Sequence, residues 1–215
     1  MASIRTKICG LTSVEDVQLA LEAGADAIGL VFYPPSSRFV TAEQAAGLAR
    51  AAGPFVTVTG LFVDASREEI LAILDKVPLQ LLQFHGNESA EFCESFQRPY
   101  IKALRMRPDM DVSAEIARYP SALAVLLDAW RPGVPGGTGE VFDWHRIPEN
   151  TGKPLILAGG LTPDNVALAA QVPGLYAVDV SGGVEQSPGR KDAEKIRLFI
   201  NNARCGSNSG DTNRE

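Results

Sequence analysis

Histidine, cysteine and excess positive charge are all scarce in this sequence of 215 residues. Two histidines and three widely spaced cysteines argue against a His-rich metal site, a zinc motif or a disulfide framework. The 20 Lys and Arg residues against 26 Asp and Glu give a net charge of −6. This balance disfavours a nucleic-acid partner, because phosphate backbones attract clustered basic residues.

Long apolar runs are also missing. No stretch approaches the roughly 20 apolar residues of a membrane helix. The first residues lead straight into a strand pattern and lack the apolar core of a signal peptide. We therefore expect no membrane partner and a cytoplasmic protein with reduced thiols.

What the chain does contain is a regular alternation of short apolar runs with segments of helical spacing. Glycines and prolines fall between these segments and mark turns. The runs that predict strands are 5–8, 27–32, 57–63, 79–83, 100–104, 124–127, 154–157 and 177–180. Helices are predicted from a cap at Thr12 or Ser13 to residue 23, at 42–52, at 70–74 opened by Ser66, and at 88–96, 112–118, 165–170 and 191–203, with a short helical piece at 142–147.

Capping signals support several of these helices. Thr41 with Gln44 and Ser66 with Glu69 have the spacing of capping boxes. Asn87 is predicted to open the fourth helix, and the pair Thr162 and Pro163 to open the sixth, with proline in the first turn.

Eight strands alternating with helices imply right-handed parallel crossovers. This number of units in about 205 residues favours a single-domain (β/α)₈ TIM barrel of the α/β class over an open doubly wound sheet. No G-x-G-x-x-G motif follows the first strand, which weakens the dinucleotide-binding alternative. We assign residues 1–204 to the barrel and 205–215 to a polar, disordered C-terminal tail, with a long loop at 128–141.

Reactive residue types follow several of the predicted strands, where barrels of this kind build their active sites. Cys9 follows the first strand and Asp128 the sixth. Arg38 and His85 stand in the loops after the second and fourth strands, and Asp179 ends the eighth. A thiolate, an acid with a raised pKa and a guanidinium that binds a carboxylate are the functional interpretations. The alternatives are a buried apolar cysteine, a capping aspartate, a solvated arginine and a structural histidine.

Two glycine-rich turns follow the last two strands. Gly159 and Gly160 precede a predicted helix, and Ser181, Gly182 and Gly183 end the eighth strand. Small residues let backbone N–H groups converge on an anion, and barrels often bind phosphate between these two loops. Ordinary glycine turns are the alternative.

Eight segments, in order along nearly the whole chain, closely resemble the phosphoribosylanthranilate isomerase family. They are Lys7-Ile8-Cys9-Gly10, Pro35-Ser36-Ser37-Arg38, Gly60-Leu61-Phe62-Val63, Gln83-Phe84-His85-Gly86, Leu127-Asp128-Ala129, Gly136-Gly137-Thr138-Gly139 with Phe142-Asp143-Trp144, Leu157-Ala158-Gly159-Gly160-Leu161, and Asp179-Val180-Ser181-Gly182-Gly183-Val184-Glu185. The resemblance implies a (β/α)₈ barrel of tryptophan biosynthesis that performs an Amadori rearrangement without metal or organic cofactor.

The resemblance also implies roles for individual residues. Cys9 matches the general base and Asp128 the general acid. Arg38 matches the residue that meets the anthranilate carboxylate, His85 and Asp179 match other substrate contacts, and the glycine loops match the phosphate site. A base near neutral pH requires that the surroundings lower the pKa of Cys9 from its ordinary value of about 8.5. Lys7 shares the strand face of Cys9 and could supply that positive potential.

The sequence departs from the family's usual residues at Phe84, Gly182, Glu140 and Asp64, none of which is a catalytic candidate. Two other functions stay open. A histidine-pathway isomerase would carry an aspartate where Cys9 stands, and a non-catalytic phosphosugar-binding barrel should have lost the acid or the base. We expect a monomer in preference to a homodimer.

Overall fold

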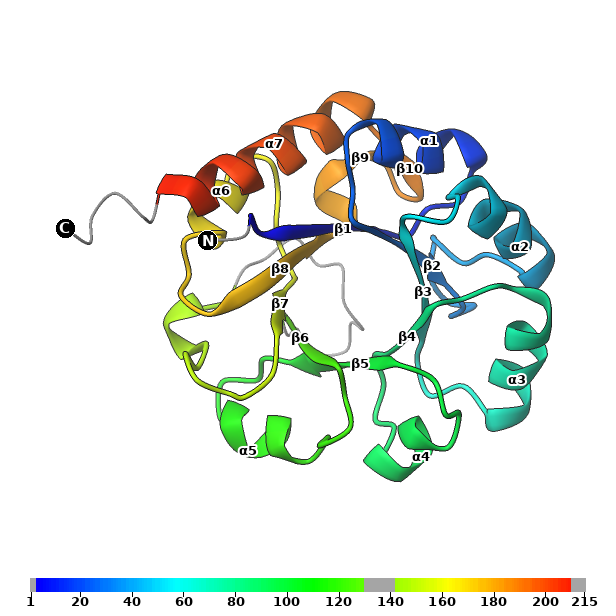
Figure 1. Cartoon of the computed structure of the whole chain (residues 1–215), viewed down its shortest axis with the longest axis horizontal. Coiled ribbons are helices and arrows are strands. Elements are labelled where there is room, and N and C mark those ends of the chain that lie inside the picture. The colour runs from blue at the N-terminus through cyan, green and yellow to red at the C-terminus, as the bar shows by residue number, and fades with distance from the viewer. Residues whose placement is uncertain (1–2, 130–141, 210–215) are drawn as a thin grey trace.

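Eight parallel strands pair in chain order, and the first pairs with the last to close a barrel. The computed structural model describes residues 3–129 and 142–209 (Figure 1). The strands are β1 (Arg5–Cys9), β2 (Ala27–Val31), β3 (Thr57–Phe62), β4 (Leu81–Phe84), β5 (Tyr100–Arg105), β6 (Ala124–Asp128), β7 (Leu155–Leu157) and β8 (Leu175–Val180). The predicted TIM barrel and its eight strands are confirmed, with boundary differences of a few residues.

Helices surround the barrel and cover its outer face (Figure 1). They are α1 (Val14–Glu22), α2 (Ala42–Ala51), α3 (Arg67–Lys76), α4 (Ala90–Glu94), α5 (Val112–Ala117), α6 (Val166–Ala169) and α7 (Ala193–Ser209). Short 3₁₀ turns occur at η1 (Trp144–Arg146) and η2 (Gly182–Val184). Among the described residues, no helix is long and apolar enough to cross a membrane.

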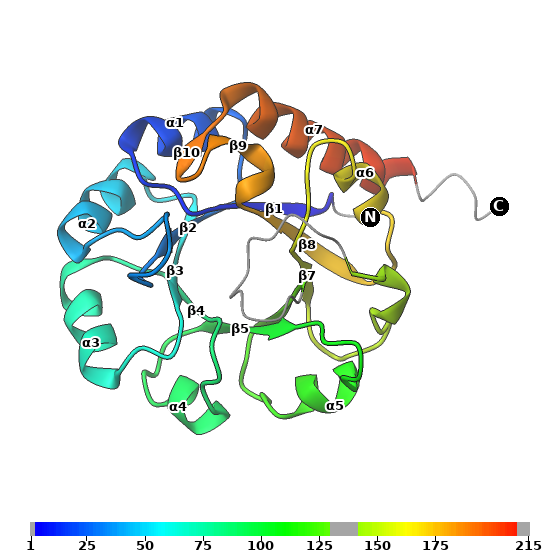
Figure 2. The ribbon, with the colours of Figure 1, turned by 180° about the vertical axis from the view of Figure 1, so that it is seen from behind.

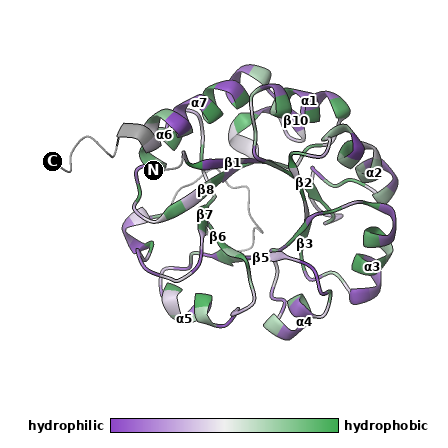
Figure 3. Cartoon of the chain, viewed as in Figure 1, coloured by the Kyte–Doolittle hydropathy of each residue, from purple (hydrophilic) through white to green (hydrophobic). Residues whose placement is uncertain are grey.

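Apolar side chains occupy two zones. The larger lies between the strands and the helices, and Figure 3 shows the apolar residues along the inner faces of several helices. The smaller fills the barrel interior with alternate residues of the strands, among them Ile101, Leu126 and Ile156. Strands buried on both faces explain why the sequence shows continuous apolar runs instead of alternation.

Local capping signals predict the helix starts where the partners are close in sequence. Thr41 and Gln44 form a complete capping box, as do Ser66 and Glu69. Ser13, one of the two residues predicted for the first helix, is its cap and accepts a hydrogen bond from the N–H of Asp16.

Three predicted helix starts are wrong. The fourth helix begins at Ala90 after the cap Ser89, because the carboxylate of Glu88 is held in the preceding loop by Lys102 and by backbone N–H groups. The sixth begins at Val166, and Asn165 uses its side chain to close the loop before the helix. Pro163 therefore stands before the helix instead of in its first turn.

The third error concerns the start of the last helix, which was predicted at residue 191. Lys191 belongs to a small antiparallel hairpin, β9 (Glu185–Ser187) with β10 (Arg190–Lys191), and α7 starts two residues later. The helical spacing of the sequence gives no sign of this hairpin. It lies beside α1 (Figure 2).

The predicted boundary between barrel and tail is also wrong. The last helix continues through Ser209, so residues 205–209 belong to it. Gly206 is buried, and a Cβ at this position would collide with the backbone of Ala167. A glycine here lets α7 approach α6 closely.

Candidate active site

A cavity of about 710 Å³ opens at the ends of the strands and is lined by loops that follow them. The structure brings all ten predicted site residues to its wall: Cys9, Arg38, His85, Asp128, Gly159, Gly160, Asp179, Ser181, Gly182 and Gly183. They come from six different strand ends or loops, so only closure of the barrel places them together. Glu140 and the segment Gly136-Gly137-Thr138-Gly139, both part of the resemblance, lie outside the described residues.

Cys9 is the last residue of β1 and lies on the inner face of the barrel beside a buried ion pair. Nζ of Lys7 is 2.9 Å from Oδ1 of Asp179, and both side chains are buried. Gly29 on the neighbouring strand makes room for the thiol, since a Cβ there would lie 2.5 Å from Sγ of Cys9. The thiol is therefore held at a fixed place in the wall by close packing.

The pKa of Cys9 differs from the sequence-based expectation. Burial raises the pKa of this thiol above its ordinary value, and the positive charges of Lys7 and Lys191 offset only part of that effect. The expectation that the surroundings lower the pKa is wrong, because the loss of solvent around the thiol outweighs the charge of the lysine. Lys7 itself has a raised pKa, since Asp179 and Cys9 outweigh the effect of burial.

Asp128 ends β6 and is hydrogen-bonded to His85. Nε2 of His85 lies 3.0 Å from Oδ2 of Asp128, and the other ring nitrogen, Nδ1, lies 3.1 Å from Nε2 of Gln83. A Cβ at Gly159 would lie 2.7 Å from Oδ1 of Asp128, so the glycine turn packs directly against this carboxyl group. His85 therefore contacts the predicted acid, and this contact was not predicted from the sequence.

Arg38 lies across the cavity wall and makes a two-pronged ion pair. Its Nε and Nη2 donate to Oε1 and Oε2 of Glu185 at 2.7 and 2.8 Å. Its backbone N–H donates to Oγ of Ser36, which stabilises the turn that carries it. Hydrogen bonding to Glu185 raises the pKa of the guanidinium, so Arg38 stays positively charged.

The two glycine loops pack against each other. A Cβ at Gly183 would collide with the carbonyl oxygen of Leu161 in the loop after β7. Gly159 and Gly160 both have positive φ, which favours glycine. The turn η2 starts at Gly182, and the first N–H groups of such a turn have no acceptor within it. Both glycine loops line the same cavity.

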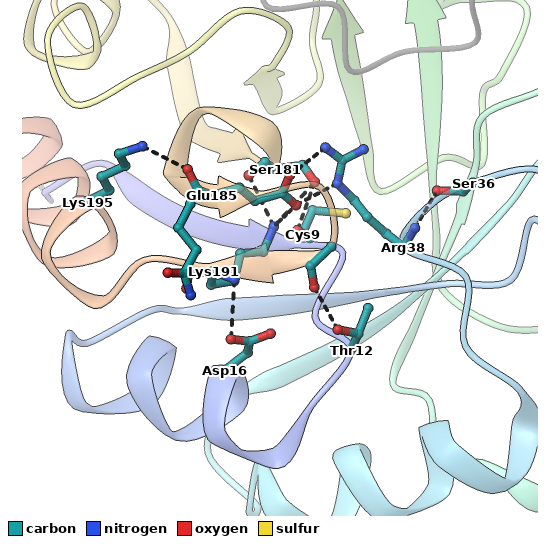
Figure 4. Close-up of polar contacts among 11 residues, drawn as sticks. Cys9, Thr12, Asp16, Ser36, Arg38, Ser181, Glu185, Lys191 and Lys195 are labelled. Carbon is teal, nitrogen blue, oxygen red and sulfur yellow. Dashed lines mark hydrogen bonds and ion pairs between the residues drawn. The ribbon is translucent and has the colours of Figure 1, made fainter.

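Two charged residues of the site were not recognised from the sequence. Glu185 was noted only as the end of a motif, and Lys191 was assigned to a helix. Lys191 is buried and its Nζ lies 2.9 Å from Oε1 of Glu185 and 3.1 Å from the carbonyl oxygen of Ser181 (Figure 4). Recognising Lys191 would have required predicting the β9–β10 hairpin, which brings this residue back to Glu185.

The departures at Asp64 and Phe84 fit their surroundings. Asp64 has a φ of 49° and its carboxylate accepts a hydrogen bond from the backbone N–H of Asn87, so a short acidic side chain suits this left-handed position. Phe84 is fully buried and packs edge-to-face against Phe92 and Tyr100. Neither residue changes the cavity's charged groups.

Comparisons with known proteins agree with this geometry. A family model described as N-(5'phosphoribosyl)anthranilate (PRA) isomerase matches residues 6–202. The chain is 62% identical over 200 residues to N-(5'-phosphoribosyl)anthranilate isomerase of Cellvibrio japonicus, covering 93% of each chain. The solved phosphoribosyl anthranilate isomerase of Thermotoga maritima has a TM-score of 0.85 and 39% identity, covering 93% of this chain and 98% of that one.

A further solved structure has the same share of each chain covered, with a TM-score of 0.79 and 37% identity. It is phosphoribosyl anthranilate isomerase in complex with reduced 1-(o-carboxyphenylamino)-1-deoxyribulose 5-phosphate. Together with the closed barrel and the cavity at its mouth, these matches show that the chain belongs to the N-(5'-phosphoribosyl)anthranilate isomerase family.

Proposed function

We propose that this isomerase uses Cys9 as general base and Asp128 as general acid to convert N-(5'-phosphoribosyl)anthranilate to 1-(2-carboxyphenylamino)-1-deoxyribulose 5-phosphate. The observation that carries the proposal is that a thiol and a carboxyl group from different strands line the same cavity, beside an arginine and two glycine loops. The substrate offers a carboxylate and a phosphate to match the last two features.

Asp128 delivers the first proton. Ring opening requires protonation of the furanose oxygen, and a carboxylic acid can supply this proton. If the Gln83 amide N–H donates to Nδ1 of His85, then Nε2 carries the ring proton and donates to Oδ2 of Asp128. Oδ1 is then the oxygen that holds the proton to be transferred. His85 thus fixes the orientation of the acid.

Cys9 acts in the second step, in which it removes a proton from C2 of the substrate. Ring opening leaves an iminium ion, which makes the hydrogen at C2 acidic, and the thiolate takes this hydrogen to give an enolamine. The enolamine tautomerises to the ketone. Because burial raises the pKa of Cys9, the thiolate is a minor form, and the charges of Lys7 and Lys191 are what keep that form accessible.

Binding groups line the same cavity as these two residues. Arg38 holds the anthranilate carboxylate, for which a planar guanidinium is well suited. The loops containing Gly159, Gly160 and 181–183 bind the phosphate through backbone N–H groups. Asp179 contacts the substrate while it is paired with Lys7.

A non-catalytic phosphosugar-binding barrel is the alternative of a different class. It would keep the glycine loops but would not need a thiol and a carboxyl group at one cavity. A histidine-pathway isomerase is the other alternative, and it is disfavoured by the cysteine at position 9. Both alternatives predict no consumption of phosphoribosylanthranilate.

The test follows anthranilate fluorescence while phosphoribosylanthranilate, generated in place, is consumed by the purified protein. We expect the wild type to consume it, and Cys9→Ser and Asp128→Asn to lose activity by about 10²–10⁴-fold each. Decay at the uncatalysed rate with wild type would contradict the proposed reaction. Phosphosugar binding by that inactive protein would favour the binding barrel.

We also propose that the protein acts as a monomer, because the ten predicted site residues of one chain already line the cavity. Light scattering during gel filtration tests this, and a mass near twice 23.0 kDa would contradict it.

The proposed location is the cytoplasm, which is supported by the buried free thiols of Cys9 and Cys93, since thiols persist in reducing compartments. Cell fractionation tests this, and recovery of the protein outside the cytoplasmic fraction would contradict it.

A further inference from the structure

Glu185 lies between two cations at the edge of the cavity (Figure 4). It receives the two hydrogen bonds of Arg38 and a third, at 2.9 Å, from Nζ of Lys191. The side chain of Lys191 is fully buried, that of Glu185 is 6% exposed and that of Arg38 is 18% exposed. The three charges sum to +1, so the cluster stays favourable to an anion.

The ion pair uses one edge of the guanidinium. Within the described residues, the hydrogen bonds of the Arg38 guanidinium run through Nε and Nη2, both to Glu185. Nη1 stands on the other side, and in Figure 4 no contact is drawn to it. Arg38 also lines the cavity, and this second edge is the one that the ion pair with Glu185 does not use.

The stem of Arg38 is confined as well. A Cβ at Gly10 would lie 2.5 Å from Cδ of Arg38, and a Cβ at Gly182 would lie 3.2 Å from Nη2. Arg38 therefore lies against two glycines, and Glu185 decides how its planar end is turned.

We propose that Glu185 is a positioning residue, which holds the Nε–Nη2 edge of Arg38 so that the Nη1 side meets the carboxylate of the substrate's aromatic ring. The inference rests on the proposed role of Arg38 and assigns to Glu185 a part in substrate recognition without contact to the reacting atoms. Lys191 joins this cluster to the phosphate loop, since its Nζ also donates to the carbonyl oxygen of Ser181.

The alternative is that Glu185 competes with the substrate for Arg38. Glu185 would then occupy the place of the substrate carboxylate and would have to leave before the substrate binds. That exchange would strand a buried carboxylate with Lys191 alone. Breaking one side of a buried ion pair is strongly destabilising, whereas a second anion on the free edge of the guanidinium requires no such loss. The geometry thus favours positioning.

The test compares two ligands. The first is a product analogue, the reduced form of 1-(o-carboxyphenylamino)-1-deoxyribulose 5-phosphate. The second is the same compound without the carboxyl group. Dissociation constants are measured by calorimetry for wild type, Glu185→Gln, Arg38→Met and the double variant. Glu43→Gln is the matched control, because Glu43 forms an exposed ion pair with Lys76 away from the cavity.

We expect Glu185→Gln to weaken binding of the carboxylated ligand by about tenfold and of the other ligand by less than about twofold. KM should rise by a similar factor with a smaller change in kcat. In the Arg38→Met background the additional loss should disappear, and Glu43→Gln should match wild type.

Tighter or unchanged binding of the carboxylated ligand by Glu185→Gln would overturn positioning, as would equal weakening of both ligands. If Arg38→Met still discriminated between the ligands as the wild type does, the proposed role of Arg38 would fall, and the role of Glu185 with it. Should Glu185→Gln not fold, Arg38→Lys tests the same point, because lysine keeps the charge but has no second edge. Full discrimination by Arg38→Lys would also overturn the proposal.

Discussion

Nε2 of His85 lies 3.0 Å from Oδ2 of Asp128, while Nε2 of Gln83 lies 3.1 Å from Nδ1 of the same ring. The three side chains form a line that starts in the buried part of β4 and ends at the proposed general acid. Such an arrangement fixes both the orientation of the carboxyl group and the position of its proton.

Replacement of His85 by Ala should therefore lower kcat by about tenfold, because the carboxyl group of Asp128 is still present but loses the side chain that orients it. The effect should be smaller than that of Asp128→Asn. Steady-state kinetics with the fluorescence assay measure both variants. A His85→Ala variant with unchanged kcat would show that the hydrogen bond does not contribute to catalysis.

The raised pKa of Cys9 gives a second prediction. The rate of alkylation of Cys9 by iodoacetamide, followed by mass spectrometry of its peptide, should rise with pH to a midpoint above 9.0, the ordinary thiol value. In Lys7→Met the midpoint should move higher still, because a charge that stabilises the thiolate is removed. A midpoint below 9.0 in the wild type would contradict the effect of burial at this site.

Cys93 predicts how stability depends on alkaline pH. Burial raises the pKa of this thiol from 9.0 to about 12 in the folded protein. The folded-state pKa is the higher one, so the stabilisation is complete below pH 9 and is lost as the pH rises toward 12. One such group contributes a slope of up to about 1.4 kcal/mol per pH unit in that window.

Urea unfolding of wild type and Cys93→Ala between pH 8 and about 10.5 checks this prediction. The free energy of unfolding should fall less steeply with pH in the variant, whatever its stability at neutral pH. Equal slopes in the two proteins would contradict the assignment.

The two glycines beside Arg38 should respond differently to alanine. Gly10 has a φ of 74°, and an added Cβ would lie 2.5 Å from Cδ of Arg38 and 2.9 Å from Oγ of Ser181. At Gly182 the added Cβ meets only Nη2 of Arg38, at 3.2 Å. Backbone strain of about 1–2 kcal/mol and displacement of the arginine should raise KM of Gly10→Ala by about tenfold or more.

Gly182→Ala is the matched control, since an added Cβ there has only this one neighbour within 4 Å. Its KM should stay within about threefold of wild type, because the contact is with the end of a side chain. Equal KM values for the two variants would contradict the close packing of Arg38 against Gly10.

The parts of this fold that depend on neighbours in sequence were predictable. The capping boxes at Thr41 and Ser66 join residues three apart, and their geometry follows from local backbone conformation. The strands were predictable because apolar runs buried on both faces stand out from helical spacing.

Interactions between distant residues were not predictable in this way. The pair of Arg38 and Glu185 joins positions 147 apart. Glu88 was predicted to lie in a helix, but its ion pair with Lys102 on the next strand holds it in the loop before that helix. The pKa of Cys9 shows the same limit. Its lysine neighbour was visible in the sequence, but the degree of burial that outweighs the lysine is a property of the closed barrel.

The roles of Cys9 as base and Asp128 as acid are tested most directly by measuring turnover and binding separately in Cys9→Ser and Asp128→Asn. Turnover is measured by fluorescence, and the dissociation constant of the reduced product analogue is measured on the same preparations. The account predicts that kcat falls by about 10²–10⁴-fold in each variant while affinity for the analogue changes by less than about threefold. Variants that lose affinity in proportion to activity, or that keep substantial kcat, would contradict the assignment of Cys9 as base and Asp128 as acid.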